Sequence, residues 1–457
     1  MSEMNLKQFL KNAANVRPSA RQLAWFDREF YAFAHFGVNS VTGREWGLGN
    51  EDPAIFNPSE LDCDEWVEAV KSAGMRGIIL TAKHHDGFCL WPSKYTEHCV
   101  KNSPFRNGKG DVVKELSEAC ARGGIGMGLY LSPWDRNSKL YGTDAYNDYY
   151  CAQLTELMTN YGEIMEVWFD GACGEGPNGK KQVYDFDRYI EIIRRYQPNA
   201  VIFNDFGPDI RWCGNEAGRG RPEEWAVVPH ELCKRGTVPQ TEGAMLAGDL
   251  SYLINSDEAV GNLNQILYSK GLVFCGSEID TSIRDGWFHH PEEEPHSLEH
   301  LMKVYLNSVG HNSCLNLNIP PMANGRFDPR DIARLKEFGA ELKKQFGEPI
   351  ATVEFPQPVK TLSDTQTSYR IELPKDRGNK PGKWICLEED IRFGQRVDSF
   401  CVYSVKDGVR MPHSCTCGRT IGHKQICECD DWEERDSFEI VITAARDAAQ
   451  MKRITVY

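Results

Sequence analysis

Short β-rich apolar runs alternate with amphipathic helical patterns from residue 25 to about residue 345. This alternation predicts repeated strand and helix units, which pack as a parallel sheet covered by helices. The expected strands are residues 31–39, 77–85, 126–133, 165–171, 201–206 and 272–279. The expected helices between them are residues 63–73, 111–121, 146–161 and 186–196. Many strand ends are polar and no G-x-G-x-x-G turn follows a strand, so we predict an α/β fold of the (β/α)8-like TIM barrel type rather than a dinucleotide-binding sheet.

The chain after residue 347 has a different pattern. A helix expected at 329–346 is followed by Gly347 and Pro349, which are typical helix stop signals. Beyond it, strand-like segments at 384–388, 397–405, 438–443 and 453–457 are joined by polar turns, and the polar stretch 362–383 is expected to be an exposed loop. We therefore predict a catalytic barrel over residues 1–347 and a C-terminal β-sandwich over residues 348–457.

The charge of the chain argues against two kinds of partner. With 52 Lys and Arg against 66 Asp and Glu, the formal net charge is -14, which disfavours nucleic acid or an anionic membrane. No apolar run approaches the ~18 residues of a membrane helix, and residues 1–16 lack the apolar core of a signal peptide. We therefore expect a cytoplasmic protein if Met1 is the native start, and a secreted or periplasmic one if a leader was removed.

Most of the 16 cysteines stand singly in apolar segments, which is typical of buried reduced thiols in a reducing compartment. One cluster differs, because Cys415 and Cys417 form one C-x-C pair and Cys427 and Cys429 form a second. On adjacent strands of a hairpin, these four thiols could converge on zinc. Structural zinc sites usually place two or more residues between paired cysteines. We therefore expect plain strand thiols in a hairpin and no metal.

One expected strand ends on a lone carboxylate beside an aromatic ring. Residues 164–171 read Ile-Met-Glu-Val-Trp-Phe-Asp-Gly. Because side chains alternate along a strand, Trp168 and Asp170 face one way while Val167 and Phe169 face the other. Parallel barrels collect their catalytic groups at the C-terminal strand ends, and an aromatic plane beside an acid suits a sugar ring. This segment therefore favours a carbohydrate site at that end of the barrel.

Other strand ends and the loops after them carry polar or aromatic side chains that a barrel core does not require: His35, Glu45, Trp46, His84, His85, Asp86, Tyr130, Trp134, Asn204 and Asp205. The adjacent His84 and His85 could indicate a metal. However, metal ligands at strand ends usually stand at i and i+2, since neighbours face opposite walls unless the strand bends. Two imidazoles can instead hydrogen-bond the vicinal hydroxyls of a sugar. We therefore favour sugar binding over metal binding.

A set of motifs covers the whole expected barrel in order. They are Ala34-His35-Phe36-Gly37, Glu45-Trp46-Gly47, Thr81-Ala82-Lys83-His84-His85-Asp86-Gly87-Phe88, Gly128-Leu129-Tyr130-Leu131-Ser132, Val167-Trp168-Phe169-Asp170-Gly171, Gly214-Asn215-Glu216-Ala217-Gly218, Ser282-Ile283-Arg284-Asp285-Gly286-Trp287-Phe288 and Asn316-Leu317-Asn318-Ile319-Pro320-Pro321. With these motifs the chain resembles the α-L-fucosidases of glycoside hydrolase family 29. The segments 214–218 and 282–288 look like the subfamily that cleaves α-1,3- and α-1,4-linked fucose from branched, Lewis-type glycans, and the tail is similar to its β-sandwich.

The resemblance implies a retaining exo-α-L-fucosidase that needs no cofactor. Asp170 would be the nucleophile that forms a covalent fucosyl-enzyme. A second carboxyl, ~5 to 5.5 Å away, would protonate the leaving oxygen and then activate water. The Gly-Asn-Glu-Ala-Gly motif assigns this acid/base role to Glu216. The sequence alone leaves four rival carboxyls open: Glu223, Glu224, Glu278 and Asp280.

The remaining family positions imply a fucose pocket, whose expected partner is a fucosylated oligosaccharide or glycoconjugate. The side chains expected to hold ring hydroxyls are His35, Glu45, Trp46, His84, His85 and Tyr130. Trp168 and Trp287 are expected to pack apolar faces of the sugar, including its C5 methyl. Arg284 and Asp280 are expected to orient the acid or contact the aglycone. An ion pair of Arg284 with Glu278 or Asp280 that only shapes the loop is an equal alternative.

Two other functions stay open at this point. A metal-dependent barrel hydrolase would use His35, His84, His85 and Asp170 as ligands, and chelation would inactivate it. A catalytically degenerate carbohydrate-binding protein would use the β-sandwich for recognition. The second alternative is disfavoured because both candidate carboxylates are retained.

Overall fold

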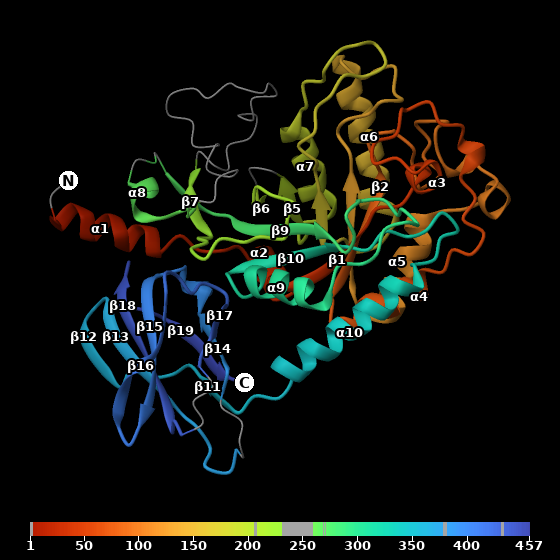
Figure 1. Cartoon of the computed structure of the whole chain (residues 1–457). Helices are drawn as coiled ribbons and strands as arrows, with labels where there is room; N and C mark the ends of the chain where they lie inside the picture. The colour runs from red at the N-terminus through yellow and green to blue at the C-terminus, as the bar shows by residue number, and fades with distance from the viewer. Residues whose placement is uncertain are drawn as a thin grey trace.

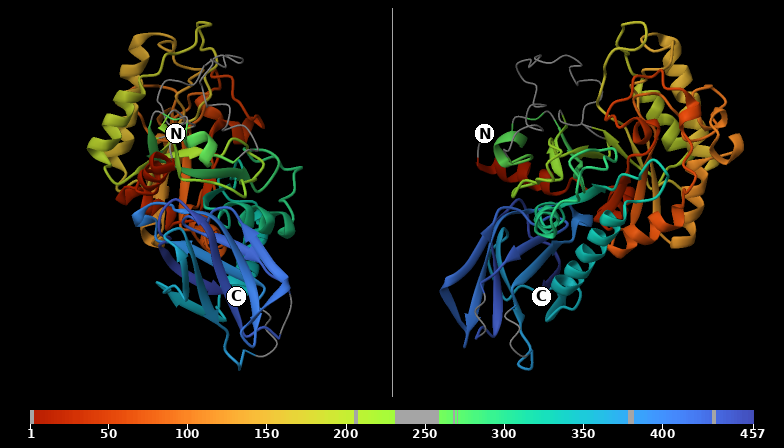
Figure 2. Two further views of the ribbon diagram at one scale, coloured as in Figure 1. Left: turned by 90° about the vertical axis from the view of Figure 1, so that its left-hand side faces the viewer. Right: turned by 45° about the vertical axis from the view of Figure 1, so that its right-hand side comes forward.

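The computed structural model describes residues 3–204, 208–230, 259–267, 269, 271–377, 382–430 and 434–457. Figures 1 and 2 show a larger lobe and a smaller C-terminal lobe, joined by helix α10 (Pro329–Phe346). The expected strand 201–206 is described only as far as Asn204, so its last two residues, Asp205 among them, lie outside the described residues.

Eight parallel strands close into a barrel in the order β1-β10-β9-β6-β5-β4-β3-β2. They are β1 (Phe30–Ala34), β2 (Gly77–Lys83), β3 (Gly126–Leu131), β4 (Glu166–Trp168), β5 (Val201–Asn204), β6 (Ile210–Trp212), β9 (Gly276–Ser282) and β10 (Ser313–Asn318). The TIM-barrel prediction is confirmed. Strands β6 and β10 were not predicted, because β6 has only three residues and β10 reads Ser-Cys-Leu-Asn-Leu-Asn.

The expected strand 272–279 is in fact two strands. Its first part, β8 (Leu272–Phe274), pairs with β7 (Val227–Pro229) outside the barrel, and its second part begins β9. The expected strand 31–39 is also too long, because the chain leaves β1 after Ala34 and forms the short helix α3 (Val38–Thr42). In both places the predicted strand extends past a point where the backbone changes direction, because apolar residues continue beyond that point.

The helices on the outside of the barrel include α2 (Ala20–Phe26), α4 (Cys63–Ser72), α5 (Val112–Gly123), α6 (Asp144–Asn160), α7 (Phe186–Tyr196) and α9 (Leu298–Ser308), beside α10. Two further helices, α1 (Glu3–Ala14) and α8 (Leu263–Ile266), lie on the side away from α10 (Figure 1). Four helices begin at an aspartate whose carboxylate accepts a hydrogen bond from the first turn: Asp62, Asp111, Asp185 and Asp328. These caps satisfy N–H groups that lack an intrahelical partner, which defines where each helix starts.

Strand β4 shows how the barrel interior is separated from its outer wall. Val167 and Phe169 pack in the large core between strands and helices, whereas Trp168 packs in the interior cluster. Aromatic rings fill this interior, and the Trp168 ring stacks on Phe203 with centroids 4.0 Å apart and planes 5° apart. The alternation expected for this strand therefore holds, and Asp170 continues the inward series just beyond the strand end.

The C-terminal lobe is a sandwich of two sheets. One contains β11 (Ala351–Glu354), β19 (Met451–Val456), β14 (Trp384–Glu389) and β17 (Gln425–Glu428), and the other contains β12 (Lys360–Ser363), β13 (Gln366–Glu372), β18 (Ser437–Ala445), β15 (Val397–Lys406) and β16 (Val409–Gly418). The prediction of a loop over 362–383 is wrong for the part that forms β13. There Tyr369 and Ile371 face the core, and the polar residues between them concealed this period-2 pattern.

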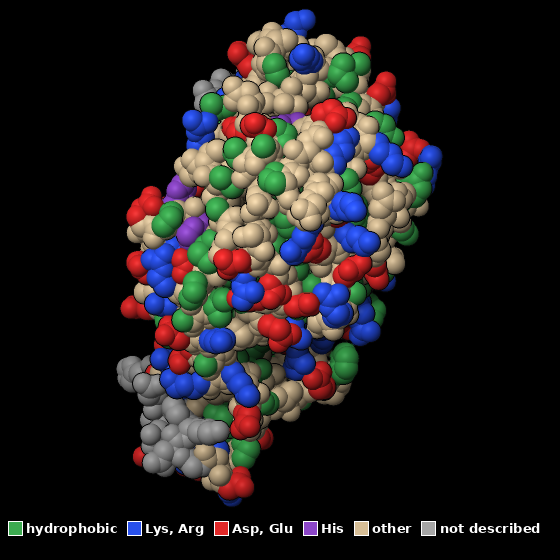
Figure 3. Space-filling model, turned by 90° about the vertical axis from the view of Figure 1, so that its right-hand side faces the viewer, with side chains coloured by type: hydrophobic (Ala, Val, Ile, Leu, Met, Phe, Trp, Pro, Cys, Tyr) green, Lys and Arg blue, Asp and Glu red, His purple; other side chains and the backbone are tan. Residues whose placement is uncertain are grey.

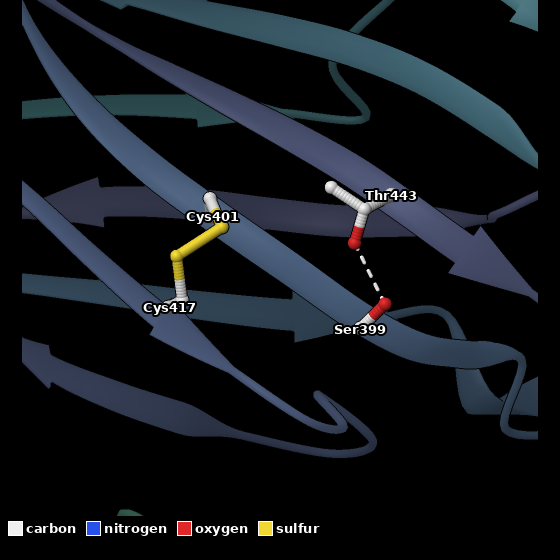
Figure 4. The surroundings of a disulfide bond; sticks show 4 residues. All are labelled: Ser399, Cys401, Cys417 and Thr443. Atoms are coloured by element: carbon white, nitrogen blue, oxygen red, sulfur yellow. Dashed lines mark hydrogen bonds between the residues drawn. A yellow bond between two sulfur atoms is a disulfide. The ribbon is translucent and has the colours of Figure 1, made fainter.

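Two expectations about the cysteines are wrong: that the cysteines of the sandwich are plain thiols, and that the two C-x-C pairs lie in one hairpin. Cys401 on β15 and Cys417 on β16 form a disulfide across the paired strands, beside the Ser399–Thr443 hydrogen bond that also links neighbouring strands (Figure 4). The two C-x-C pairs do not share a hairpin, because β16 and β17 belong to different sheets. The pairing depends on strand register, which cysteine spacing does not reveal. Most of the other described cysteines, such as Cys89, Cys213 and Cys314, are buried thiols.

Charges of both signs are interspersed on the face of the molecule that Figure 3 shows. Exposed charges also pair between neighbouring helices, as Arg122 on α5 does with Asp64 on α4 at 2.9 Å. Within the described ranges, no helix has the length and apolar character that crossing a membrane requires.

Candidate active site

A pocket opens at the C-terminal ends of the barrel strands, where parallel barrels place their reactive groups. Its volume of about 200 Å³ is below the ~300–1,000 Å³ of pockets for drug-sized ligands, so it suits a single sugar unit. The residues that line it are Phe33, His35, Glu45, Trp46, His84, His85, Tyr130, Trp168, Asp170, Ala172, Glu216, Asp280 and Trp287. The structure therefore brings together every residue expected for the fucose pocket except Arg284. Of the other strand-end residues singled out in the sequence, Asp86, Trp134 and Asn204 do not line the pocket.

Asp170 stands two residues beyond the end of β4 and is held by two donors. The Tyr130 hydroxyl, on the neighbouring strand β3, donates to its Oδ2 at 2.9 Å. The backbone N–H of Ala172 donates to its Oδ1 at 2.7 Å. The side chain is 25% exposed, and His85 Nε2 lies 3.7 Å from Oδ2. Asp170 is therefore fixed in orientation while it remains accessible from the pocket.

The Trp168 side chain, in the pocket wall, is hydrogen-bonded to a buried polar network in the barrel interior. Its Nε1–H donates to Glu278 Oε1 at 2.8 Å, and Asn316 donates to the same oxygen at 3.1 Å. The Tyr31 hydroxyl donates to the other oxygen of Glu278. Burial, together with the charge of Glu278, raises the pKa of Glu166 well above its usual value, so Glu166 is held protonated. These contacts fix the indole plane that would lie against a sugar.

The two adjacent histidines both reach the pocket because β2 ends at Lys83 and the chain turns there. The register between β2 and β3 shifts just before Lys83, so the strand is irregular at this point. An irregular strand end allows two consecutive side chains to face the same pocket. Lys83 points into the helix layer, where its buried ammonium lies 3.1 Å from Asp135. The rings of His84 and His85 then lie side by side, with centroids 4.1 Å apart.

Burial keeps the pocket histidines neutral. It lowers the pKa of His35 to about 4, although His35 Nδ1 lies 2.9 Å from Asn318 Oδ1. Burial also lowers the pKa of His84 well below its usual value, and the neighbouring histidines add to this effect. For His85, burial lowers the pKa while the charge of Asp170 opposes the shift. A neutral imidazole offers one donor and one acceptor, which is what two adjacent sugar hydroxyls can use.

Glu216 comes from the loop after β6. The Asn215 side chain shapes this loop by accepting hydrogen bonds from two backbone N–H groups further along it, at 3.1 and 3.3 Å. Gly218 has a φ of +65°, a conformation that favours glycine. Thr281 on β9 donates to the Glu216 backbone carbonyl at 2.9 Å. The two glycines of the motif thus flank a tight loop, which is hydrogen-bonded to the neighbouring strand β9.

The Glu216 carboxyl is set up differently from that of Asp170. Partial burial raises its pKa, and the charges of Asp170 and Glu45 raise it further. The Trp287 Nε1–H, which donates to Glu216 Oε2 at 3.2 Å, opposes this shift. A raised pKa means that the carboxyl binds its proton more tightly than a free glutamic acid does, so Glu216 is suited to be the acid in this pocket.

Glu45 anchors the loop that carries Trp287. Its Oε2 accepts from the backbone N–H of Trp287 at 2.9 Å, and its Oε1 accepts from that of Phe288 at 3.2 Å. The ring of Trp46 packs edge-on against Trp134 with centroids 5.5 Å apart. Trp46 is 58% exposed and therefore forms the rim of the pocket.

Arg284 is placed behind the pocket, which corrects the expected contact with substrate. Its Nε donates to both carboxylate oxygens of Asp331, at 3.0 and 2.9 Å, and its Nη2 lies 3.0 Å from Asp328 Oδ2. Both aspartates belong to the start of α10. The alternative pairing with Glu278 or Asp280 is also wrong. Arg284 ties the loop after β9 to a helix 47 residues away, a distance over which the sequence carries no signal.

Of the carboxyls that rivalled Glu216 in the sequence, Asp280 is the one that also lines the pocket. Glu224 is buried against Arg211 and Arg221, Glu278 supports Trp168, and Glu223 lies 3.3 Å from Arg419.

Asp280 itself accepts a hydrogen bond from Trp212 Nε1 at 2.7 Å. Burial, followed by the charges of Glu216 and Glu278, raises its pKa well above the usual value. Burial therefore favours the neutral, protonated form of Asp280. Sequence reasoning treated it as a rival acid and did not anticipate this shift of its pKa.

A sequence model of the α-L-fucosidase family matches residues 2–347. The chain belongs to the α-L-fucosidase family of glycoside hydrolases. Alpha-L-fucosidase 1 of Arabidopsis thaliana is 37% identical over 463 residues, which cover 96% of this chain and 87% of the plant protein. A putative α-L-fucosidase from Bacteroides ovatus superposes with a TM-score of 0.87 at 41% identity and covers 99% of this chain and 76% of that one. A Ruminococcus gnavus family 29 fucosidase in complex with fucose superposes with a TM-score of 0.80 at 28% identity, over 97% and 95% of the two chains.

The histidines of this α-L-fucosidase are occupied by protein partners on one ring nitrogen. His85 Nδ1 lies 2.7 Å from Ser132 Oγ, and His84 Nδ1 lies 3.4 Å from Asn39 Nδ2. Among the residues that the structure describes, no three His, Cys, Asp or Glu side chains are grouped as metal ligands. The remaining ring nitrogens are the ones that could face a sugar.

Proposed function

We propose that this α-L-fucosidase is a retaining exo-enzyme that removes terminal α-1,3/1,4-linked L-fucose from branched, Lewis-type glycans. The observation that carries the proposal is the pairing of two unlike carboxyls in one small pocket. Asp170 is held by two hydrogen-bond donors, whereas Glu216 has a raised pKa. Retaining glycosidases use such a pair as nucleophile and acid/base.

In the first step, an Asp170 oxygen would attack the anomeric carbon of fucose. The bond from that carbon to the glycosidic oxygen breaks, and the Glu216 proton passes to the departing oxygen. In the second step, the Glu216 carboxylate takes a proton from water, whose oxygen displaces Asp170 from the anomeric carbon. Each carboxyl returns to its starting state, and two inversions give net retention.

The size and lining of the pocket support exo action on a single sugar. A volume of about 200 Å³ leaves room for one ring, and Trp46 marks the rim where the rest of the glycan would emerge. The neutral histidines and Glu45 would bind ring hydroxyls, and Trp168 and Trp287 would pack the apolar faces. The preference for α-1,3/1,4 linkages rests on the resemblance of segments 214–218 and 282–288 to that subfamily.

The test is hydrolysis of matched α-1,2, α-1,3, α-1,4 and α-1,6 fucosides, followed by proton NMR from the first turnovers. Retention predicts that α-L-fucose appears first and the β anomer only later, by mutarotation. Initial release of the β anomer would contradict the retaining mechanism. Turnover that is fastest on the α-1,2 or α-1,6 fucoside would contradict the linkage assignment without affecting the rest.

A further inference from the structure

Side chains of the C-terminal sandwich contact residues 223–226, the segment that follows the Glu216 loop. Gln395, just before β15, accepts from the backbone N–H of Ala226 at 2.8 Å and donates to the Glu224 carbonyl at 3.3 Å. Gln395 and Glu224 are 0% and 1% exposed, so these are buried hydrogen bonds. Removing one partner of such a bond leaves the other unsatisfied, which makes the contact specific.

Arg446, just after β18, makes the second buried contact between the sandwich and the barrel domain. Its guanidinium carbon lies 3.3 Å from the centroid of the Trp225 ring. Its Nη2 donates to the Gly261 carbonyl at 2.7 Å, and within the sandwich its Nε lies 3.3 Å from Asp398. Arg419 adds an exposed contact to Glu223 at 3.3 Å. The four consecutive residues 223–226 are thus all contacted from the sandwich.

The same segment holds both ends of the loop that carries Glu216. Arg211, on β6 before the loop, pairs with Glu224 and donates to the Trp225 carbonyl at 3.1 Å. Arg221, after the loop, lies 3.1 Å from the other oxygen of Glu224. The buried Glu224 carboxylate is therefore the common anchor of the two loop ends. A shift of the segment would displace the loop as a unit.

We infer that the sandwich is a positioning domain for the acid/base, with Gln395 and Arg446 as positioning residues that act on Glu216 through segment 223–226. This inference rests on the proposed role of Glu216. Asp170 is held by Tyr130 and Ala172, which both belong to the barrel. Loosening the sandwich contact should therefore impair proton transfer to the leaving group more than nucleophilic attack.

The experiment compares Gln395→Met and Arg446→Met in the full chain on two substrates. One is an α-1,3/1,4-fucosylated trisaccharide, whose leaving group needs a proton, and the other is α-L-fucosyl fluoride, whose leaving group needs little assistance. Since kcat/KM reports the first chemical step, we expect it to fall about tenfold for the trisaccharide and less than about twofold for the fluoride. The basic limb of the trisaccharide pH profile should also move, which loss of folded protein alone would not cause.

Arg410→Met is the matched control, because Arg410 pairs with Glu439 at 2.8 Å within the sandwich. It should leave both rates unchanged. Equal losses on the two substrates, or no loss on either, would overturn the inference. If a buried variant fails to fold, Arg419→Ala makes the same comparison at an exposed contact and should show a smaller split of the same sign. Glu216→Gln is measured in parallel, and the absence of a split there would instead refute the acid/base role.

Discussion

Asp170 and Glu216 face one pocket, but the chain holds them in different ways. Asp170 extends the inward series of a strand and is fixed by the adjacent strand and by the backbone N–H two residues on. Glu216 lies on a loop whose position depends on Thr281, Trp287 and the buried Glu224 anchor. The comparison shows that strand periodicity and two contacts next to β4 place one of the two proposed catalytic carboxyls, whereas the other needs contacts from distant parts of the chain.

The largest effect is expected from removing the proposed nucleophile. Asp170→Gly should lower kcat about 10⁴-fold or more on every fucoside, because it removes the carboxylate proposed to attack the anomeric carbon. Azide can enter the space left by the side chain and attack the β face of α-L-fucosyl fluoride, so the rescued product should be β-L-fucosyl azide. NMR identifies the anomer. Recovery of α-L-fucosyl azide would mean that Asp170 is not the nucleophile.

Removing the proposed acid/base should give a smaller and selective loss. Glu216→Gln is expected to lower kcat/KM on the trisaccharide about 10²- to 10³-fold while sparing α-L-fucosyl fluoride. Here azide would attack the intact fucosyl-enzyme and give α-L-fucosyl azide, the opposite anomer to that from Asp170→Gly. The basic limb of the pH profile should disappear with the proton donor. An unchanged basic limb would assign it to another group.

Asp280→Asn tests the rival carboxyl in the same pocket. Since burial favours the protonated form of Asp280, an amide of the same shape preserves its neutrality, and we expect a loss of no more than about tenfold with no difference between the two substrates. Trp212→Phe, which removes the donor to Asp280, is the control for local packing. A loss confined to the trisaccharide, with azide rescue, would transfer the acid/base role from Glu216 to Asp280.

The smallest effect is expected at Trp287. Trp287→Phe keeps an aromatic face but removes the hydrogen bond that lowers the pKa of Glu216. The pKa of Glu216 should therefore rise, so the acid stays protonated to higher pH and the basic limb of kcat/KM shifts upward. The rate at the optimum should fall only about threefold, as for loss of one hydrogen bond. A downward shift of the limb would show that Trp287 does not act on Glu216 in this way.

Much of the fold and of the pocket could be predicted because both depend on local pattern. Alternating strand and helix signals indicate the barrel, and His35, His84, His85 and Tyr130 fall in one pocket because parallel strands bring their C-terminal ends to one rim. The prediction failed where partners are remote. Arg284 pairs with the start of α10, and Cys401 forms a disulfide with Cys417 because of the strand register. Strand β13 was missed for another reason, since polar residues interrupt its apolar pattern.

By itself, the sequence determined the barrel, the inward direction of Trp168 and Asp170, and most of the residues that meet at the pocket. These follow from side-chain periodicity and from the order of motifs along the chain. Only the tertiary structure decided which carboxyls have a raised pKa and how the Glu216 loop is anchored. Both depend on burial and on neighbours far away in sequence, namely the charges around Asp280 and the sandwich contacts on segment 223–226.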